Sequence, residues 1–188
     1  MALTRQDLLL LLLYAPIPDS GSIAGRTRLA KIMFIFREEA WEESGFEDVL
    51  PRGELPEFAP WRFGPFSKEL SQDVSFFSRI GFVEAHVPDN QPQATRSFER
   101  AFWLDEDPEG EEPRLDRFVV EEFTLTELGT RYVEDEGLWD ALSEGQQEAL
   151  IHLKHRFTNV PLRDVLRYVY TRYPESATRS EIVDKVLR

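Results

Sequence analysis

Residues 63–83 read FGPFSKELSQDVSFFSRIGFV, and this stretch decides most of the fold. Ser67 stands where the N-cap of a helix is expected. Apolar side chains then recur at helical spacing: Leu70, Val74, Phe77 and Ile80. Gly81 is a typical C-terminal stop, because glycine adopts the left-handed conformation that ends many helices. The stretch therefore predicts a helix over 68–80, preceded by a Gly-Pro turn and followed by a strand over 82–87.

Two further helices are predicted before this stretch. The apolar run Leu8–Leu13 lies in a predicted helix over 4–14, which Thr4 caps. A spanning helix needs roughly 20 apolar residues, so we expect a buried helix and a cytoplasmic protein rather than a membrane or secreted one. A second helix is predicted over 27–43, with one apolar face: Leu29, Ile32, Met33, Phe36 and Ala40. Arg28, Lys31 and Arg37 lie off that face.

Strands and turns dominate the middle of the chain. Strands are predicted over 97–104 and 117–125, on either side of the acidic segment 105–113 (DEDPEGEEP), which is expected to be a solvated loop. Thr126 is a candidate N-cap for a helix over 127–137.

The last third is predicted to be helical. Ser143 and Gln146 have the spacing of a capping box, for a helix over 144–157. A further helix opens at Pro161, and Thr178 with Glu181 forms a second predicted capping box before a short final helix.

Together these elements predict a helix-dominated α+β fold. Three helices followed by a β-hairpin is the order of a winged helix-turn-helix core, with the helix over 68–80 in the recognition position. Residues 1–137 would form this winged-helix-like domain. Residues 138–188 would form a helical tail packed on the same domain.

Composition excludes several classes of protein. The 188 residues contain no cysteine, so disulfide scaffolds, thiolate zinc sites and cysteine nucleophiles are ruled out. The formal net charge of −13 disfavours generic binding to nucleic acid or to an anionic membrane. The charge is unevenly spread: residues 22–37 hold four basic residues and no acid, whereas residues 105–136 hold thirteen acidic and three basic residues.

Several quoted motifs resemble one family. These are GRTRLAKIMFIF at 25–36, FGPFSKEL at 63–70 with IGFV at 80–83, and FTLTELG at 123–129. Over about residues 4–135 the chain resembles the Panacea (SocA-like) antitoxin-domain proteins and the related YwgA-type phage-associated proteins. Residues 161–175 resemble the helical tail of the YwgA-type group. The resemblance implies a winged-helix-like module in antitoxins or in phage-linked and defence-linked regulators, and it brings no catalytic residues.

The aromatic corner around the Gly-Pro turn is a candidate partner-binding surface. Its residues are Trp61, Phe63, Gly64, Pro65 and Phe66. Glycine permits a backbone angle closed to other residues and proline fixes the next one, so the same corner would also serve as a purely structural turn that docks the third helix. Both interpretations stay open from the sequence.

A second candidate surface is basic and would bind duplex DNA. Its residues are Arg26, Arg28, Lys31, Lys68, Gln72, Ser75, Arg79, Arg163 and Arg167. Arginine and lysine would contact phosphates, and the polar residues of the predicted recognition helix would reach base edges. The alternative is that these cations pair with acidic segments of the same chain or of a second copy.

Little in the sequence points to catalysis. His152 and His155 are spaced i, i+3 on a predicted helix, but no further ligand accompanies them, so a solvated helix face is favoured over a metal site. Tyr168, Tyr170 and Tyr173 are expected in the core or at an interface. We therefore predict no enzyme, cofactor or metal. The leading hypothesis is a regulatory module that binds a protein partner, such as a toxin or a basic protein, and the alternative is a dimeric DNA-binding transcriptional regulator.

Overall fold

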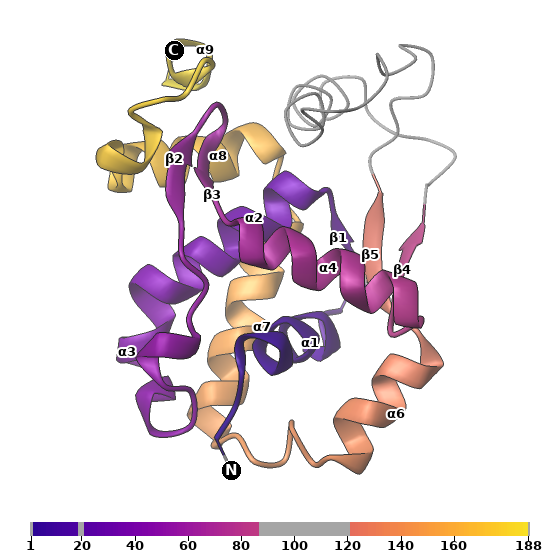
Figure 1. The fold of residues 1–188 in the computed structure, drawn as a ribbon. Coiled ribbons are helices and arrows are strands. Elements are labelled where there is room, and N and C mark those ends of the chain that lie inside the picture. The colour runs from indigo at the N-terminus through magenta and orange to yellow at the C-terminus, as the bar shows by residue number, and fades with distance from the viewer. Residues whose placement is uncertain (1, 19–20, 87–120, 188) are drawn as a thin grey trace.

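The computed structural model describes residues 2–18, 21–86 and 121–187, and it has a helix-dominated α+β fold (Figure 1). The predicted strand over 97–104 and the acidic segment 105–113 lie outside the described residues, as does the first part of the strand predicted over 117–125.

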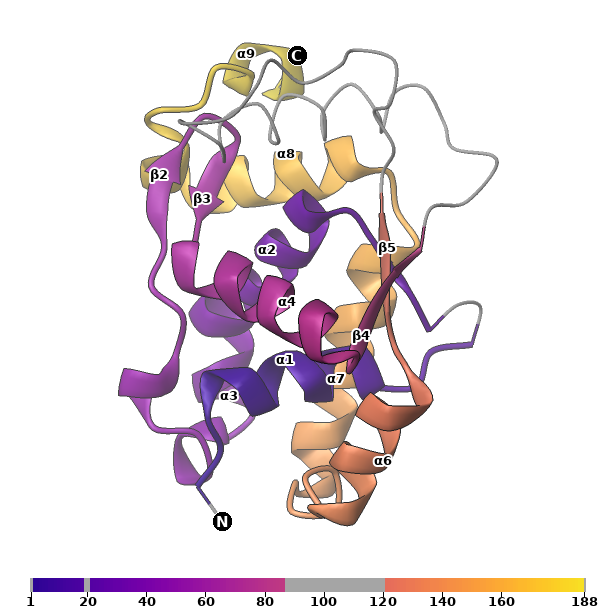
Figure 2. The ribbon, with the colours of Figure 1, turned by 45° about the vertical axis from the view of Figure 1, so that its right-hand side comes forward.

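The first helix, α1 (Arg5–Tyr14), lies near the centre of the molecule (Figures 1 and 2). It begins with a capping box, in which the Thr4 side chain accepts from the Asp7 amide and the Asp7 side chain accepts from the Thr4 amide. All six leucines from Leu8 to Leu13 are buried, so no side of this segment faces water. A helix that is apolar all round belongs in a core, which confirms the predicted buried helix.

The second predicted helix consists of three consecutive pieces. These are α2 (Arg26–Ile35), the π-helix η1 (Phe36–Ala40) and the short α3 (Trp41–Glu43). Every residue of α2 from Thr27 to Ile35 is buried, including those predicted to lie on a polar face. The prediction of one amphipathic helix was wrong because α2 is covered on several sides, among them by α7 and α8.

A three-stranded antiparallel sheet brings the amino-terminal and central parts together. Its order is β1-β5-β4, from β1 (Ile23–Ala24), β5 (Glu122–Leu125) and β4 (Val83–His86). Val83 pairs with Leu125 and Ala85 with Phe123. The predicted pairing of the strands that follow the 68–80 helix is confirmed for these residues.

The Gly-Pro turn forms part of a second, two-stranded sheet. Strands β2 (Ala59–Trp61) and β3 (Gly64–Phe66) pair in an antiparallel hairpin, with Pro60 opposite Pro65. The expectation that Gly64-Pro65 simply breaks the chain was therefore wrong.

Two predicted helices flank the three-stranded sheet. In α4 (Lys68–Ile80) the Ser67 hydroxyl accepts from the Leu70 amide, and Gly81 ends the helix with φ +79°. In α6 (Glu127–Asp135) the Thr126 hydroxyl accepts from the Gly129 amide. Both caps were predicted correctly.

The carboxyl-terminal helices are α7 (Glu144–Thr158), α8 (Leu162–Arg172), the 3-10 helix η4 (Pro174–Ala177) and α9 (Val183–Leu187). The capping box at Ser143 is confirmed. The second one is not, because the Thr178 hydroxyl donates to the Glu175 carbonyl and the Glu181 carboxylate lies 3.3 Å from Arg62. One hydrophobic cluster contains residues from α1 and α2 together with residues from α7 and α8.

Candidate functional site

The basic helix predicted to contact phosphates lies inside the molecule. Arg28 is only 5% exposed, and its guanidinium donates to the carbonyls of Phe157 at 2.5 Å and Val160 at 2.8 Å. These carbonyls follow the end of α7, where a helix leaves acceptors without internal partners and favours positive charge. The prediction that Arg28 binds nucleic acid was therefore wrong, because its donors stabilise the end of α7.

Lys31 is also fully buried. Its Nζ donates to the Pro65 carbonyl at 2.9 Å, which ties α2 to strand β3. A buried ammonium is costly unless it is hydrogen-bonded, so this contact holds the hairpin in place. The predicted role of Lys31 in phosphate binding was wrong for the same reason as that of Arg28.

A third buried cation was not anticipated. The Nζ of Lys154 donates to the carbonyls of Leu13 at 2.6 Å and Ala15 at 2.8 Å, at the end of α1. Burial lowers the pKa of Lys154 to about 8. The sequence carried a signal, because Lys154 lies one turn after Leu150 and beside Leu153 on the apolar face of α7.

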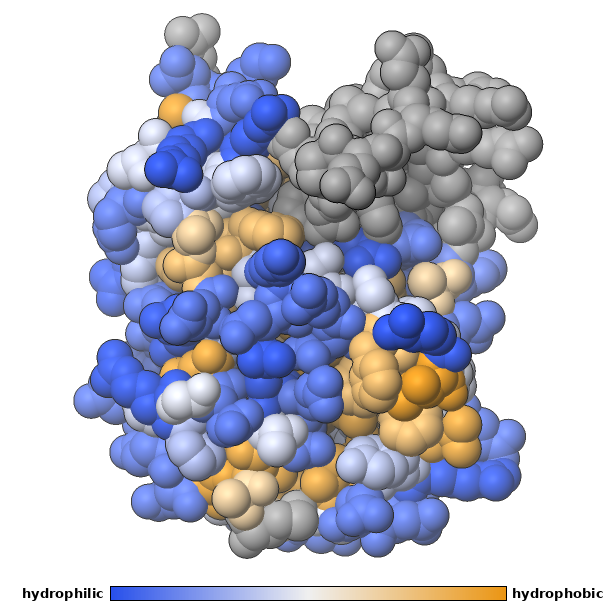
Figure 3. Space-filling view, viewed as in Figure 1, coloured by the Kyte–Doolittle hydropathy of each residue, from blue (hydrophilic) through white to orange (hydrophobic). Residues whose placement is uncertain are grey.

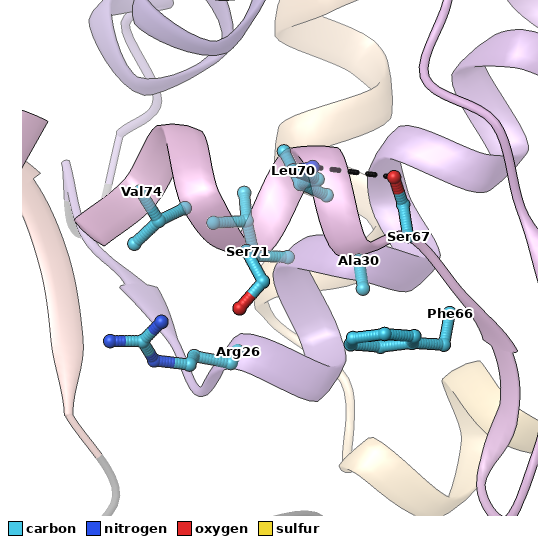
Figure 4. A pocket seen from close by; sticks show the side chains of 8 residues that line it. Arg26, Ala30, Phe66, Ser67, Leu70, Ser71 and Val74 are labelled. Atoms are coloured by element: carbon cyan, nitrogen blue, oxygen red, sulfur yellow. Dashed lines mark hydrogen bonds between the residues drawn. The ribbon is translucent and has the colours of Figure 1, made fainter. Parts of the chain in front are cut away.

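Arg26 is held against the sheet at the start of α2. Its Nε lies 3.7 Å from a carboxylate oxygen of Glu121, and its guanidinium lies 5.6 Å from the centre of the Phe123 ring. Figure 4 shows Arg26 and Phe66 on either side of the place where α4 crosses α2. The cavity between them measures about 20 Å³, which is room for one or two water molecules at about 10–15 Å³ each and for no larger ligand.

The outer side of α4 collects the remaining predicted base-reading residues. Lys68, Gln72, Ser75 and Arg79 are all exposed, and an open depression of about 450 Å³ lies beside the last three. Asp73 lies in this depression and is buried, where it accepts from the Arg5 Nε at 2.6 Å and the Gln6 Nε2 at 2.9 Å. The structure thus brings four of the nine predicted nucleic-acid-binding residues onto one helix.

Arg163 and Arg167 lie elsewhere, on α8. Both are exposed, and the Arg167 Nε also donates to the Val186 carbonyl at 3.1 Å. In both ribbon views α2 lies between α8 and α4 (Figures 1 and 2). The predicted basic residues therefore form no single surface.

The aromatic corner is mostly interior. Phe63, Gly64 and Pro65 are buried, so the prediction that they contact a partner was wrong. Gly64 has φ +85°, and a Cβ there would come within 2.6 Å of the Tyr170 ring. Trp61 remains 37% exposed, with its ring centre 6.2 Å from that of the half-buried Phe66. The turn is chiefly a structural one that packs on α8.

An apolar surface that the sequence did not indicate lies next to the outer side of α4. Figure 3 shows apolar side chains gathered over the carboxyl end of α4 and the start of α6. Phe76, Ile80 and Leu128 are 38%, 39% and 52% exposed, and the half-buried Phe82 lies between the two helices in the chain. We call these four residues the α4–α6 patch. Ile80 had been predicted on the buried side of its helix, and that prediction was wrong.

Acidic groups surround this patch. Burial and the nearby carboxylates of Asp7 and Glu136 raise the pKa of Tyr132, whose ring lies 5.0 Å from that of Phe82. Residues 83–86 and 121–136, which form β4, β5 and α6, hold seven acidic residues and one basic residue. The patch therefore combines apolar side chains with a negative field.

Comparison with models of protein families and with curated proteins gives no match. The surface described above therefore has to be interpreted from its own chemistry.

The described residues give no support to metal or membrane sites. Over residues 2–18, 21–86 and 121–187, no three histidine or carboxylate side chains are grouped to hold a metal ion, and His152 and His155 are exposed on α7. In the same part of the chain, the helices are all too short or too polar to cross a bilayer.

Proposed function

We propose that this protein is a non-enzymatic regulatory module that binds a protein partner through the α4–α6 patch. The observation that carries this proposal is the grouping of Phe76, Ile80 and Leu128 on one exposed area. Single exposed apolar residues are ordinary, whereas contiguous ones with a polar edge are typical of interaction sites. This places the partner surface on α4, since the basic α2 and most of the aromatic corner are interior.

The surroundings of the patch favour a partner segment that is both apolar and basic. The acidic residues of β4, β5 and α6 would attract a positively charged segment and speed its encounter with the patch. The apolar side chains would then supply most of the affinity, as buried hydrophobic anchors commonly do. A basic protein, such as one that itself binds nucleic acid, has this chemistry.

The arrangement of elements supports a winged-helix-like core. The order is α1, β1, α2, α4, β4 and β5, and the sheet order β1-β5-β4 places the two strands after α4 beside each other. In such a core α4 occupies the position of the recognition helix. The resemblance to the Panacea (SocA-like) and YwgA-type proteins adds an antitoxin-like or defence-linked role as the biological setting we propose.

The experiment is an affinity co-purification from the native host, with and without nuclease, followed by reconstitution with the purified partner. The test variant is Phe76→Ser with Ile80→Ser, and the matched control is Leu187→Ser, which alters an equally exposed apolar residue on α9. We expect the double variant to weaken binding at least about thirtyfold, because each central anchor contributes about 2 kcal/mol or more. The control should bind like the wild type.

A DNA-binding regulator is the second candidate, favoured by the four polar residues that α4 exposes. Lys68→Gln with Arg79→Gln tests it, because each lost phosphate contact lowers the slope of log K against log salt by about 0.9. Enrichment of specific DNA fragments that this variant loses, and that the apolar double variant retains, would overturn the protein-partner proposal. Loss of a stoichiometric protein in the apolar double variant alone would support it.

A further inference from the structure

A separate hollow lies between the segment η1–α3 and helix α7, and its walls carry opposite charges. It measures about 220 Å³. Glu39 and Glu43 lie on one wall, and His152 and Arg156 lie on the other. Leu153 and Phe157, both buried, form its apolar base. A single water needs only about 10–15 Å³, so the hollow has room for a small organic molecule.

The acidic wall is held in position before any ligand arrives. The Tyr168 hydroxyl lies 2.8 and 2.9 Å from the two carboxylate oxygens of Glu39, and the Tyr173 hydroxyl donates to Glu39 Oε1 at 2.7 Å. A carboxylate offers about four acceptor positions, so Glu39 keeps one for a further donor. Glu43 is exposed one helical turn later, and among the described residues its carboxylate has no hydrogen-bond or ion-pair partner.

The basic wall is also ordered by its neighbours. The Arg156 guanidinium lies 5.0 Å from the centre of the Phe157 ring and 4.9 Å from that of Tyr168, which are distances of cation–π contacts. His152 lies four residues earlier and thus on the same side of α7. Within the described part of the chain, no ion pair joins this wall to Glu39 or Glu43. The two walls therefore face the hollow without neutralising each other directly.

We propose that this hollow binds a free α-amino acid with an uncharged side chain. Its ammonium group would donate to Glu43 and to the remaining acceptor position of Glu39. Its carboxylate would accept from Arg156 and His152, and its side chain would lie on Leu153 and Phe157. Opposite charges at both ends of a small molecule match this site, whereas a simple anion or cation satisfies only one wall. Ligand pockets for larger molecules measure about 300–1,000 Å³, so the size also favours a compact metabolite.

The histidines provide a direct measurement on the full chain. The protein has three, and only His152 lies at the hollow, with His86 and His155 as internal references. Alanine, serine, valine, leucine, methionine and phenylalanine are titrated to about 10 mM while the imidazole proton resonances are followed by NMR, a range that detects any Kd below about 1 mM. We expect at least one of them to shift the His152 signals, assigned with His152→Gln, with little effect on those of His86.

Truncated analogues of the amino acid that binds then test each wall. The amide, which lacks the carboxylate, and the deaminated acid, which lacks the ammonium group, should each bind at least tenfold more weakly. Arg156→Gln should weaken binding of the amino acid but leave the amide unchanged, and Glu43→Gln should do the same for the deaminated acid. Arg163→Gln, an exposed change on α8, is the control and should have no effect. Absence of any His152 shift across the panel, or equal binding of the truncated analogues, would overturn the proposal.

Discussion

Replacing Gly129 with alanine is expected to destabilise the fold by about 3 kcal/mol, near the upper end of the usual cost of overpacking. A Cβ at this position would overlap the Phe82 carbonyl oxygen and lie 3.0 Å from the carbonyl carbon. Backbone atoms cannot rotate aside as a flexible side chain would. The Phe82 carbonyl also accepts from the Thr126 amide at 3.0 Å, and the Thr126 hydroxyl donates to the Gly81 carbonyl at 2.6 Å. Displacing Phe82 therefore disturbs the start of α6 as well.

Gly145→Ala is the matched control for this change. Gly145 also lies in a helix, α7, but no atom lies within 4 Å of its added Cβ. Alanine should stabilise that helix by up to about 1 kcal/mol. Urea denaturation of both variants measures the difference. Similar stabilities for the two variants would contradict the close contact between α6 and Phe82.

Raising the pH from about 7.5 to 10 is expected to increase the contribution of Lys154 to the free energy of unfolding by about 2 kcal/mol. Its pKa is about 8 in the folded protein, against an ordinary value of 10.5. Between these values the unfolded chain binds more protons than the folded chain, so stability rises with pH. The folded protein no longer carries a buried charge once Lys154 releases its proton.

The measurement compares urea denaturation of the wild type and Lys154→Met across this range. The comparison is needed because burial raises the pKa of Tyr170 to about 12, which lowers the stability of both proteins above about pH 10. The variant leaves the Leu13 and Ala15 carbonyls without their donor, so it should be less stable overall. Its difference from the wild type should nevertheless change with pH, and a constant difference would show that Lys154 keeps an ordinary pKa.

Local signals in the sequence predicted helix ends well. Thr4, Ser67, Thr126 and Ser143 all cap helices as expected, because an N-cap depends on a hydrogen bond to an amide only two or three residues away. The final capping box failed because Glu181 is drawn to Arg62, a contact distant in sequence. Long-range partners of this kind leave no mark on local spacing.

The candidate surfaces were harder to predict, and the reason is charge. Arginine and lysine are mostly exposed in proteins, so Arg28, Lys31 and Lys154 were expected on the surface or not considered at all. Each is buried because carbonyl groups distant in sequence accept its hydrogen bonds. The exposed apolar side chain of Ile80 was missed for the converse reason. Its spacing fits the buried face of α4, but that face is not covered as far as the last turn of the helix.

The π-helix η1 makes the length of the chain at this point unusually critical. A π turn accommodates one more residue than an α turn, so a chain shortened by one residue between Phe36 and Ala40 would continue as an ordinary α-helix. Each residue of an α-helix turns the chain by about 100°, so everything after the deletion would be rotated by that amount. Trp41, whose indole donates to the Leu50 carbonyl at 2.9 Å, would then point away from its acceptor. Deletions should consequently be tolerated far less in these five residues than in the loop that follows α3.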